Sequence, residues 1–500
     1  EILRCLVGSE MCIRDRRMEL LKTGYMGTLS LGWDNYLFLE LTGRQERSST
    51  LKDKSFFYPS ANLSFLFSNA FRMPAWWNHG KLRLSYGIVG NAPETYAANI
   101  IYEQGSDNGF TWNYVPSSWG NANIRPEKKY EYEIGLESKF LNNRLGFDVS
   151  YYNNRVKDQI LSTPQPSSSG VKYVLMNVGE VANEGWDISV SATPVLTKNF
   201  RWDLTANYGI YRNKVVKLAE GVPYLEISNI GGGGAKIQAV EGRPMGDIYV
   251  QMPQMNENGD YLVSDKGLYL NQTDLQRVGN INPDGVGGLF SSFSYKNIFL
   301  DFSIDFRIGG DVINEMYQYS TASGLTPESL QYRDTEHGGL SYYYPGNNNA
   351  SGTPVQVDPS SGVGPNGEII YHDGIILPGV VASTGEKNTR IIPAGYYYNQ
   401  TYNWGTQSEQ LTYRHSVFDN TYVKLRELTI GYQFPEKLTA KLGMTRLSVS
   451  IFGRNLFYFY KALKNYDAES SVGTSWASQA VVGGSTTATR NFGVSLRASF

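Results

Sequence analysis

The sequence predicts an all-β protein, a transmembrane antiparallel β-barrel, and three observations lead to this prediction. From about Gly27 onward, apolar and polar residues alternate with a period of two, as in strands with one apolar and one wet face. Many of these segments reach ten residues or more, close to the roughly 9 to 11 that a tilted transmembrane strand needs. Short connections also alternate with long ones, as they do at the two ends of an outer-membrane barrel.

The composition excludes several other classes of protein. The 500 residues are 41% hydrophobic, 18% charged and 13% aromatic, which fits neither a disordered chain nor a helical membrane protein with long apolar runs. The 45 basic and 47 acidic residues give a formal net charge of −2, which leaves no electrostatic footprint for nucleic acid. Both cysteines, Cys5 and Cys12, precede Ile13, so the rest of the chain has no thiol for a disulfide, a metal or a nucleophile.

We expect residues 1–17 to be a translation or sequencing artefact. The opening sequence EILRCLVGSEMCIRDR lacks the basic region, apolar stretch and cleavage site of a signal peptide, and it resembles a translated adapter read. The folded part is therefore expected to be residues 18–500, with no targeting signal of its own.

Thirteen strands are expected in residues 18–500. In chain order they are 27–33, 36–46, 56–67, 81–91, 125–140, 144–156, 182–195, 200–217, 287–296, 297–309, 419–434, 445–460 and 489–500.

The alternation is clearest in five of these segments. In 125–140, Tyr130, Ile134 and Leu136 lie on one face and glutamates on the other. In 144–156 and 200–217, apolar residues lie on the face opposite to Asp148 and Asp203, respectively. In 297–309, Asp301, Asp305 and Arg307 share one face, which cannot be a dry core. The last strand places Phe492, Val494, Leu496 and Phe500 on one face and polar residues on the other. In 419–434 the apolar parity changes, which predicts a bulge near Glu427.

The connections favour a barrel over a soluble β-sandwich or β-solenoid. Short links such as 34–35, 141–143, 196–199 and 296–297 alternate with long ones at 92–124, 157–181, 218–286, 310–418 and 461–488. Loops beyond about 15 residues are uncommon in compact soluble domains, whereas outer-membrane barrels have short periplasmic turns and long extracellular loops. Asp148, Asp203, Asp301 and Asp305 are then interpreted as side chains that wet the lumen rather than as catalytic acids.

Several stretches resemble the SusC/RagA family of TonB-dependent outer-membrane transporters. They include FDNTYVKLRELTIGYQFP at 418–435, followed by SVSIFGRNLFYFY at 448–460 and a terminal Phe500, with further agreement at 124–161, 177–194 and 282–312. The resemblance covers nearly all of residues 25–500 and implies a plugged barrel of 22 strands. With about 13 strands present, the plug, the TonB box and nine strands are expected upstream, and this chain is expected to be the C-terminal portion.

The resemblance also implies a function and a set of partners. It implies active import of a bulky nutrient, an oligosaccharide or a peptide, across the outer membrane, with no enzymatic reaction and no cofactor. The implied partners are TonB, a SusD-like lipoprotein lid, the barrel assembly machinery and outer-membrane lipid, in a bacterium of the Bacteroidetes type. A passive porin and a secreted glycan-binding protein or adhesin stay as alternatives.

Candidate site residues follow from aromatic clusters in the long loops, because flat rings stack on sugars and on extended peptides. They are Trp112, Tyr114, Trp119, Tyr396, Tyr397, Tyr398 and Trp404. Packing within the loops or against a lid protein is the alternative role for these rings. Phe500 is the candidate assembly signal, because it ends an exposed alternating strand. The four histidines are far apart and form no HExxH motif, so no metal site is expected.

Overall fold

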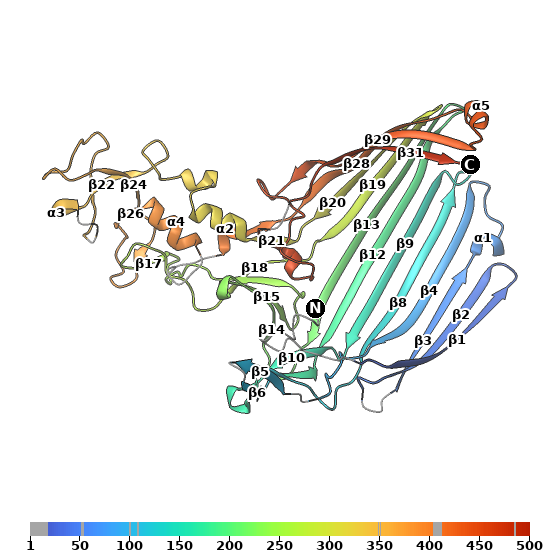
Figure 1. The fold of residues 1–500 in the computed structure, drawn as a ribbon, viewed down its shortest axis with the longest axis horizontal. Coiled ribbons are helices and arrows are strands. Elements are labelled where there is room, and N and C mark those ends of the chain that lie inside the picture. The colour runs from blue at the N-terminus through green and yellow to red at the C-terminus, as the bar shows by residue number, and fades with distance from the viewer. Residues whose placement is uncertain are drawn as a thin grey trace, which may run out of the picture.

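The computed structural model describes residues 19–51, 55–99, 102–107, 110–348, 350, 352–403, 413–484 and 487–500. Its main element is one antiparallel sheet of 13 strands, which Figure 1 shows as a curved wall of tilted strands with the long connections at one end. The strands are β1 (Lys22–Trp33), β2 (Leu37–Ser48), β3 (Ser55–Phe65), β4 (Trp77–Asn91), β8 (Glu127–Phe140), β9 (Leu145–Lys157), β12 (Glu180–Leu196), β13 (Phe200–Lys217), β19 (Gly285–Tyr295), β20 (Ile298–Ile308), β28 (Tyr422–Gln433), β29 (Arg446–Lys461) and β31 (Asn491–Ser499).

The 13 predicted strands are confirmed, and they pair in the order of the chain. The largest differences lie at strand starts: β1 begins at Lys22 and β4 begins at Trp77. The predicted bulge is also present. Ser303 pairs with Glu427 while the next residue, Ile304, pairs with Leu425, so the extra residue is Arg426, one position before the predicted site. The prediction for residues 1–17 lies outside the described residues.

The short connections are tight turns with left-handed backbone conformations. Asp34 and Asn35 have φ of 46° and 57°, and Asn142 and Asn143 have φ of 60° and 62°. Asp and Asn tolerate this region because their short polar side chains bond locally, and such turns match the twist of the paired strands. Two longer links at the same end carry the short helices α1 (Phe67–Ala70), α5 (Glu436–Thr439) and η5 (Ala440–Leu442).

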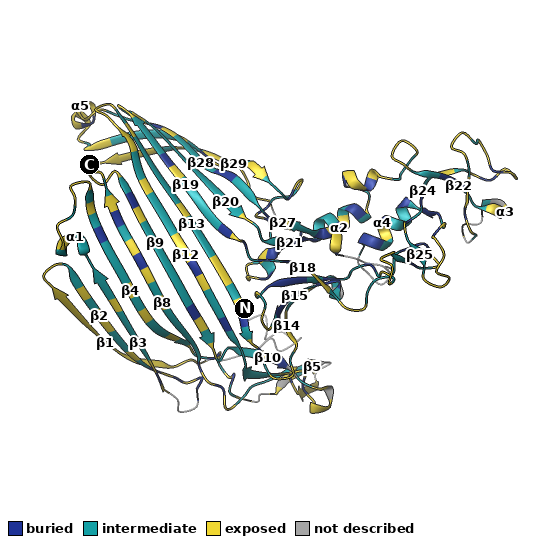
Figure 2. Ribbon diagram, turned by 180° about the vertical axis from the view of Figure 1, so that it is seen from behind, coloured by how far each residue is buried: buried dark blue, intermediate teal, exposed yellow. Residues whose placement is uncertain are grey.

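The two faces of the wall differ in chemistry. On the outer face, Val494, Ile451, Ile430 and Leu300 are direct neighbours in register across four strands, and Val494 is 71% exposed. Figure 2 shows little fully buried surface on these strands. An apolar face of this extent, left uncovered by protein, is the face that a transmembrane barrel presents to lipid.

The long connections contain short strands and helices that the sequence did not predict. Most of these strands have two to seven residues, too few for a visible period, and several pair with a different loop. They are β5 (Glu103–Asp107), β6 (Phe110–Tyr114), β7 (Ser118–Trp119), β10 (Ile160–Pro164), η1 (Ser167–Ser169), β11 (Tyr173–Asn177), β14 (Tyr224–Ile230), η2 (Gly231–Gly233), β15 (Ala235–Val240), β16 (Asp247–Val250), β17 (Leu262–Val263), β18 (Gln276–Asn280), β21 (Asp311–Asn314), α2 (Glu315–Ala322), η3 (Pro327–Leu330), β22 (Leu340–Tyr343), α3 (Pro345–Asn348), β23 (Val355–Gln356), β24 (Tyr371–Ile375), β25 (Val380–Val381), β26 (Ile392–Pro393), α4 (Ala394–Tyr402), η4 (Arg414–Ser416), β27 (Val417–Asp419), η6 (Ser478–Ala480) and β30 (Val481–Val482). Within the described ranges, no helix combines the length and the apolar character needed to cross a bilayer.

Three long loops share one hydrophobic core, which we call the loop core. It combines residues of the loop after β13, the loop after β20 and the loop after β29: Ile230, Ala235, Ile237, Ile248, Val250, Ile281, Ile313, Tyr413, Ala477, Ala480 and Val481. β21 pairs with β27 of its own loop and with β30 of the last loop. A more distant part of the second loop, with α4, β22 and β24, projects away from the wall as an arm (Figure 1). The long loops are therefore packed structures rather than loose tails.

Candidate binding site on the inner wall

The inner face carries a continuous row of paired residues from β4 to β29. Because directly paired residues point to the same side of a sheet, this row is a line across the inside of the wall. It consists of Arg83, Gly135, Ser150, Asp187, Gly209, Val286, Arg307, Tyr422 and Lys461.

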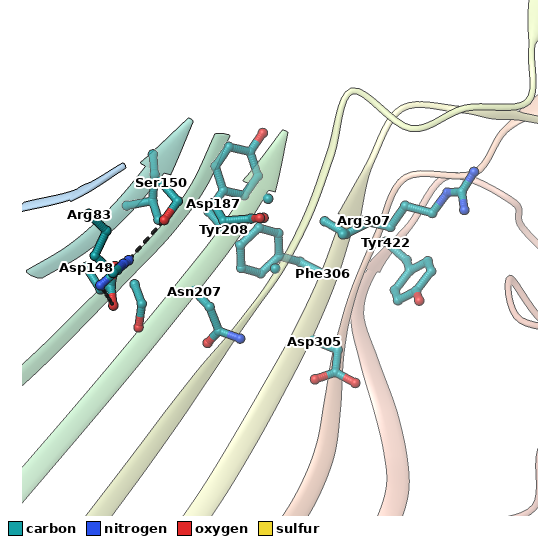
Figure 3. Close-up of a pocket in the computed structure, with 15 residues that line it drawn as sticks. Arg83, Asp148, Ser150, Asp187, Asn207, Tyr208, Asp305, Phe306, Arg307 and Tyr422 are labelled. Atoms are coloured by element: carbon teal, nitrogen blue, oxygen red, sulfur yellow. Dashed lines mark hydrogen bonds and ion pairs between the residues drawn. The ribbon is translucent and has the colours of Figure 1, made fainter. Parts of the chain in front are cut away.

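Two cavities lie along this row. The larger has a volume of about 750 Å³, and its lining includes Arg83, Asp148, Asp187, Asp305 and Arg307. Figure 3 shows these side chains on neighbouring strands of the wall. The second cavity, of about 520 Å³, is lined by residues such as Glu133, Tyr152 and Asn183. Asp187 lines both cavities, so they adjoin at this carboxylate.

Most charges around the larger cavity are paired within the wall. Arg83 donates two hydrogen bonds to Asp148, of 2.5 and 3.2 Å, and a third to Ser150. On the opposite side, Arg426 donates to Asp305 at 2.5 Å. Bidentate and charge-assisted bonds of this kind fix both partners in position. Asp203 and Asp301 lie on the same inner face, as predicted. Asp203 accepts a hydrogen bond from Arg201, and Asp301 accepts one from Ser292.

The last long loop is fastened to this wall by a charged network. Glu469, from the loop after β29, forms ion pairs with Lys424 and Arg426 of β28 and accepts a hydrogen bond from Tyr422 at 3.3 Å. The Lys424 side chain is only 2% exposed. Burial opposes ionisation of Glu469, but the hydrogen bonds from Arg426 and Lys424 outweigh it and lower the pKa of this carboxyl. The network therefore sets the position of the loop beside the larger cavity.

The predicted aromatic site residues are not brought together. Trp112 and Tyr114 lie exposed on β6, and Trp119 lies on β7, which pairs with β11. Tyr396 and Tyr397 lie on α4, in the arm, far from the β5–β6 hairpin in both views (Figures 1 and 2). Trp404 lies outside the described residues.

The burial of Tyr398 corrects the prediction that this residue of α4 contacts a ligand. Tyr398 is 4% exposed, and its hydroxyl donates to the carbonyls of Glu328 and Gln331. Burial raises the pKa of Tyr398 to about 12. The Tyr398 ring therefore packs inside the arm. Packing within the loops, the alternative role given for these aromatic residues above, applies to it.

Sequence reasoning missed Asp187 and did not single out Arg307 as a cavity residue. Both occupy polar positions of alternating strands, so their side of the sheet could be inferred. Their common row depends on the register of four strands, which a period-two pattern does not determine.

The fold and the site define the class of protein. A family model described as TonB dependent receptor-like, beta-barrel matches residues 21–241. Together with the 13-stranded wall, its polar inner face and its apolar outer face, this match assigns residues 21–241 to the TonB-dependent receptor β-barrel, a domain of outer-membrane proteins.

Individual relatives agree with this assignment. The chain is 30% identical over 330 residues to TonB-dependent receptor P26 of Formosa agariphila, covering 59% of this chain and 32% of that protein. It is 28% identical over 247 residues to TonB-dependent receptor SusC of Bacteroides thetaiotaomicron, covering 45% of this chain and 24% of that protein. The resemblance to the SusC/RagA family is thus confirmed.

A solved structure shows the same fold. The RagAB peptide transporter matches with a TM-score of 0.68 over 96% of this chain and 48% of the matched chain, at 18% identity. This chain therefore spans about half of the matched transporter chain, and smaller shares of the curated relatives.

Proposed function

We propose that this chain is the C-terminal part of a TonB-dependent receptor that imports a bulky nutrient, an oligosaccharide or a peptide, across the outer membrane. The observation that carries the proposal is the polar inner wall with a cavity of about 750 Å³, within a TonB-dependent receptor barrel. In this proposal residues 18–500 supply about 13 of the 22 strands of a plugged barrel. The plug and the TonB box precede them. TonB-dependent receptors are transporters, so no catalytic reaction is assigned.

The proposed partners act at different ends of the barrel. A SusD-like lipoprotein covers the end with the long loops, which is supported by the SusC relative and the RagAB match. TonB acts through the N-terminal region, and outer-membrane lipid covers the apolar face. The barrel assembly machinery reads the last strand, β31, together with Phe500, which follows it directly and is 84% exposed. Trp112, Tyr114 and Tyr396 are proposed as ligand contacts in the loops.

Uptake by the full-length receptor is expected to require TonB. Cells that express the receptor together with the proposed SusD-like lipoprotein should accumulate fluorescent peptides or oligosaccharides from a mixed pool. Deletion of TonB or collapse of the proton-motive force should abolish this accumulation. The matched control is a strain that lacks only the receptor. Receptor-dependent uptake that persists without TonB would indicate a passive porin, and release of the protein without detergent would indicate a secreted binding protein.

A further inference from the structure

The outer face of the wall changes character toward the long loops. The apolar outer row described above continues from Leu300 through Phe293 to Trp202 of β13. Because alternate residues of a strand point to the same side, the even-numbered residues of β13 face outward as far as Lys214. Their partners on β12, and the partners of those residues on β9 and β8, face the same way. The charged side chains of this outward surface, which we call the outer patch, belong to Lys128, Arg155, Lys157, Glu180, Glu184, Arg212 and Lys214.

Aromatic rings mark the level of the membrane interface beside the outer patch. Tyr151 and Trp186 are direct partners in the register, with ring centroids 4.9 Å apart, and the ring centroid of Tyr132 lies 6.4 Å from that of Tyr151. All three rings face outward, and tyrosine and tryptophan are enriched where a barrel crosses the membrane interface. Toward the short turns, the outward residues of β9 and β12 are apolar, such as Val149 and Ile188. The outer patch extends from the rings toward the long loops, so it lies level with lipid headgroups.

The outer patch occupies four neighbouring strands of the wall, which run side by side to the long-loop end in Figure 1. The row that contains Glu184 and Arg212 continues through Tyr132 onto β4, β3, β2 and β1 without a charge. Its outward residues there are Tyr86, Ala61, Leu41 and Leu29. The patch is therefore a local feature of the lipid-facing surface, and it lies within the part of the chain that matches the receptor-barrel family, residues 21–241.

The outer patch carries a net positive charge, because it contains five basic and two acidic side chains. The Glu180 carboxylate accepts a hydrogen bond from Arg155 at 3.2 Å. The Glu184 carboxylate accepts one from Tyr151 at 3.4 Å, and Glu184 lies opposite Arg212 in the register. With both carboxylates set against basic neighbours, three formal positive charges remain at the level of the headgroups.

Two arrangements of like charges point to an anionic ligand. Lys128 and Lys157 are direct partners on β8 and β9, and like charges directly opposite one another destabilise a sheet. In the neighbouring row, Arg155 and Lys214 lie on either side of Ala182, which has only a methyl side chain. An anion among these side chains relieves the repulsion and accepts charge-assisted hydrogen bonds, and arginine is especially suited to phosphate.

We propose that the outer patch binds the phosphate groups of a phosphorylated glycolipid in the outer leaflet of the membrane. The long loops lie at the extracellular end of the barrel, so the patch faces the headgroups of that leaflet. Clusters of basic residues at a membrane surface attract anionic headgroups. The acyl chains of the same lipid contact the apolar outward residues on the other side of the aromatic rings. The proposed site lies outside the lumen and is separate from the path of the imported nutrient.

The test measures binding of lipid A to the full-length receptor, purified and delipidated in detergent, by titration in native mass spectrometry. Lipid A with its phosphate groups is compared with the same lipid after enzymatic removal of the phosphates. We expect the phosphorylated lipid to bind at least about tenfold more tightly, because several basic side chains each favour an anionic headgroup. Inorganic phosphate in millimolar excess should not displace it, because the free ion lacks acyl chains. Equal affinities for the two lipids, or displacement by inorganic phosphate, would overturn the proposal.

Variants locate the site on the outer patch. Arg212→Gln combined with Lys214→Gln removes two positive charges, leaves the ion pair between β9 and β12 intact, and should weaken lipid A binding at least about tenfold. Arg212→Lys combined with Lys214→Arg keeps both charges and should bind lipid A as the wild type does. The matched control, Lys198→Gln combined with Lys437→Gln, removes two exposed lysines at the short-turn end and should also leave the affinity unchanged. Wild-type affinity in the first double variant would show that the site is wrong.

A second copy of the chain is the competing occupant of this surface. The same spectra report the number of receptor chains in each complex. If Arg212→Gln combined with Lys214→Gln separates a dimer into monomers while the affinity for lipid A stays the same, the outer patch is an interface between copies and the lipid proposal is wrong. Loss of lipid A binding with an unchanged number of chains is the result that we expect.

Discussion

Replacing Glu469 by alanine is expected to release the last long loop from the inner wall. The substitution leaves the nearly buried ammonium group of Lys424 without its ion-pair partner and removes one of the two carboxylates around Arg426. Breaking a buried ion pair by removal of one partner typically costs about 3–5 kcal/mol. The expected result is faster proteolytic cleavage within residues 462–490 of the full-length receptor in outer-membrane vesicles, with the rest of the barrel intact.

The matched control removes an exposed ion pair of the same sheet. Arg454 lies 2.9 Å from Glu427, and both side chains are more than a third exposed, so Arg454→Ala should cost less than about 1 kcal/mol. Equal cleavage rates for the two variants and the wild type would show that the network around Glu469 does not hold the loop.

Gly231→Ala is expected to disrupt the loop core. Gly231 has a φ of 58°, and a Cβ there would lie 1.9 Å from the hydroxyl oxygen of Tyr413, which is fully buried. Both the left-handed backbone and the overlap oppose a side chain, at a combined cost of about 2–4 kcal/mol. We expect a lower midpoint of thermal unfolding for the loops, measured by proteolysis after stepwise heating.

Two control variants accompany this substitution. Gly362→Ala places a methyl group in open space, with nothing within 4 Å, and should change nothing. The Tyr413 hydroxyl is buried without a hydrogen-bond partner among the described residues, so Tyr413→Phe should be neutral or stabilising. An unchanged midpoint for Gly231→Ala would contradict the packing of these loops into one core.

The wall of the barrel could be predicted from the sequence because its strands are long and have two chemically different faces. In β31, alternation over Phe492, Val494 and Leu496 is sufficient to identify both the strand and its lipid face. The bulge at Arg426 was visible because it changed the parity of the apolar residues in β28.

The loops and the site could not be predicted in the same way. β7 and β11 are strands of two and five residues that pair between different loops, so no local pattern marks them. Tyr398 resembles an exposed binding aromatic in the sequence, and only tertiary packing buries it. The row that joins Asp187 to Arg307 depends on three successive strand registers, and one shifted residue would turn either side chain to the lipid face.

The central claim is that this chain forms the wall of a membrane barrel with an aqueous interior. The most direct test attaches a nitroxide label to single cysteines at Ser450 or Ile451 of β29, in a full-length receptor from which any other cysteine has been removed. These adjacent residues pair with Gly431 and Ile430, respectively, and so point to opposite faces. In outer-membrane vesicles, the label at residue 451 should collide mainly with oxygen dissolved in lipid, and the label at residue 450 mainly with a water-soluble nickel complex. Equal access of the nickel complex to both positions would contradict the claim.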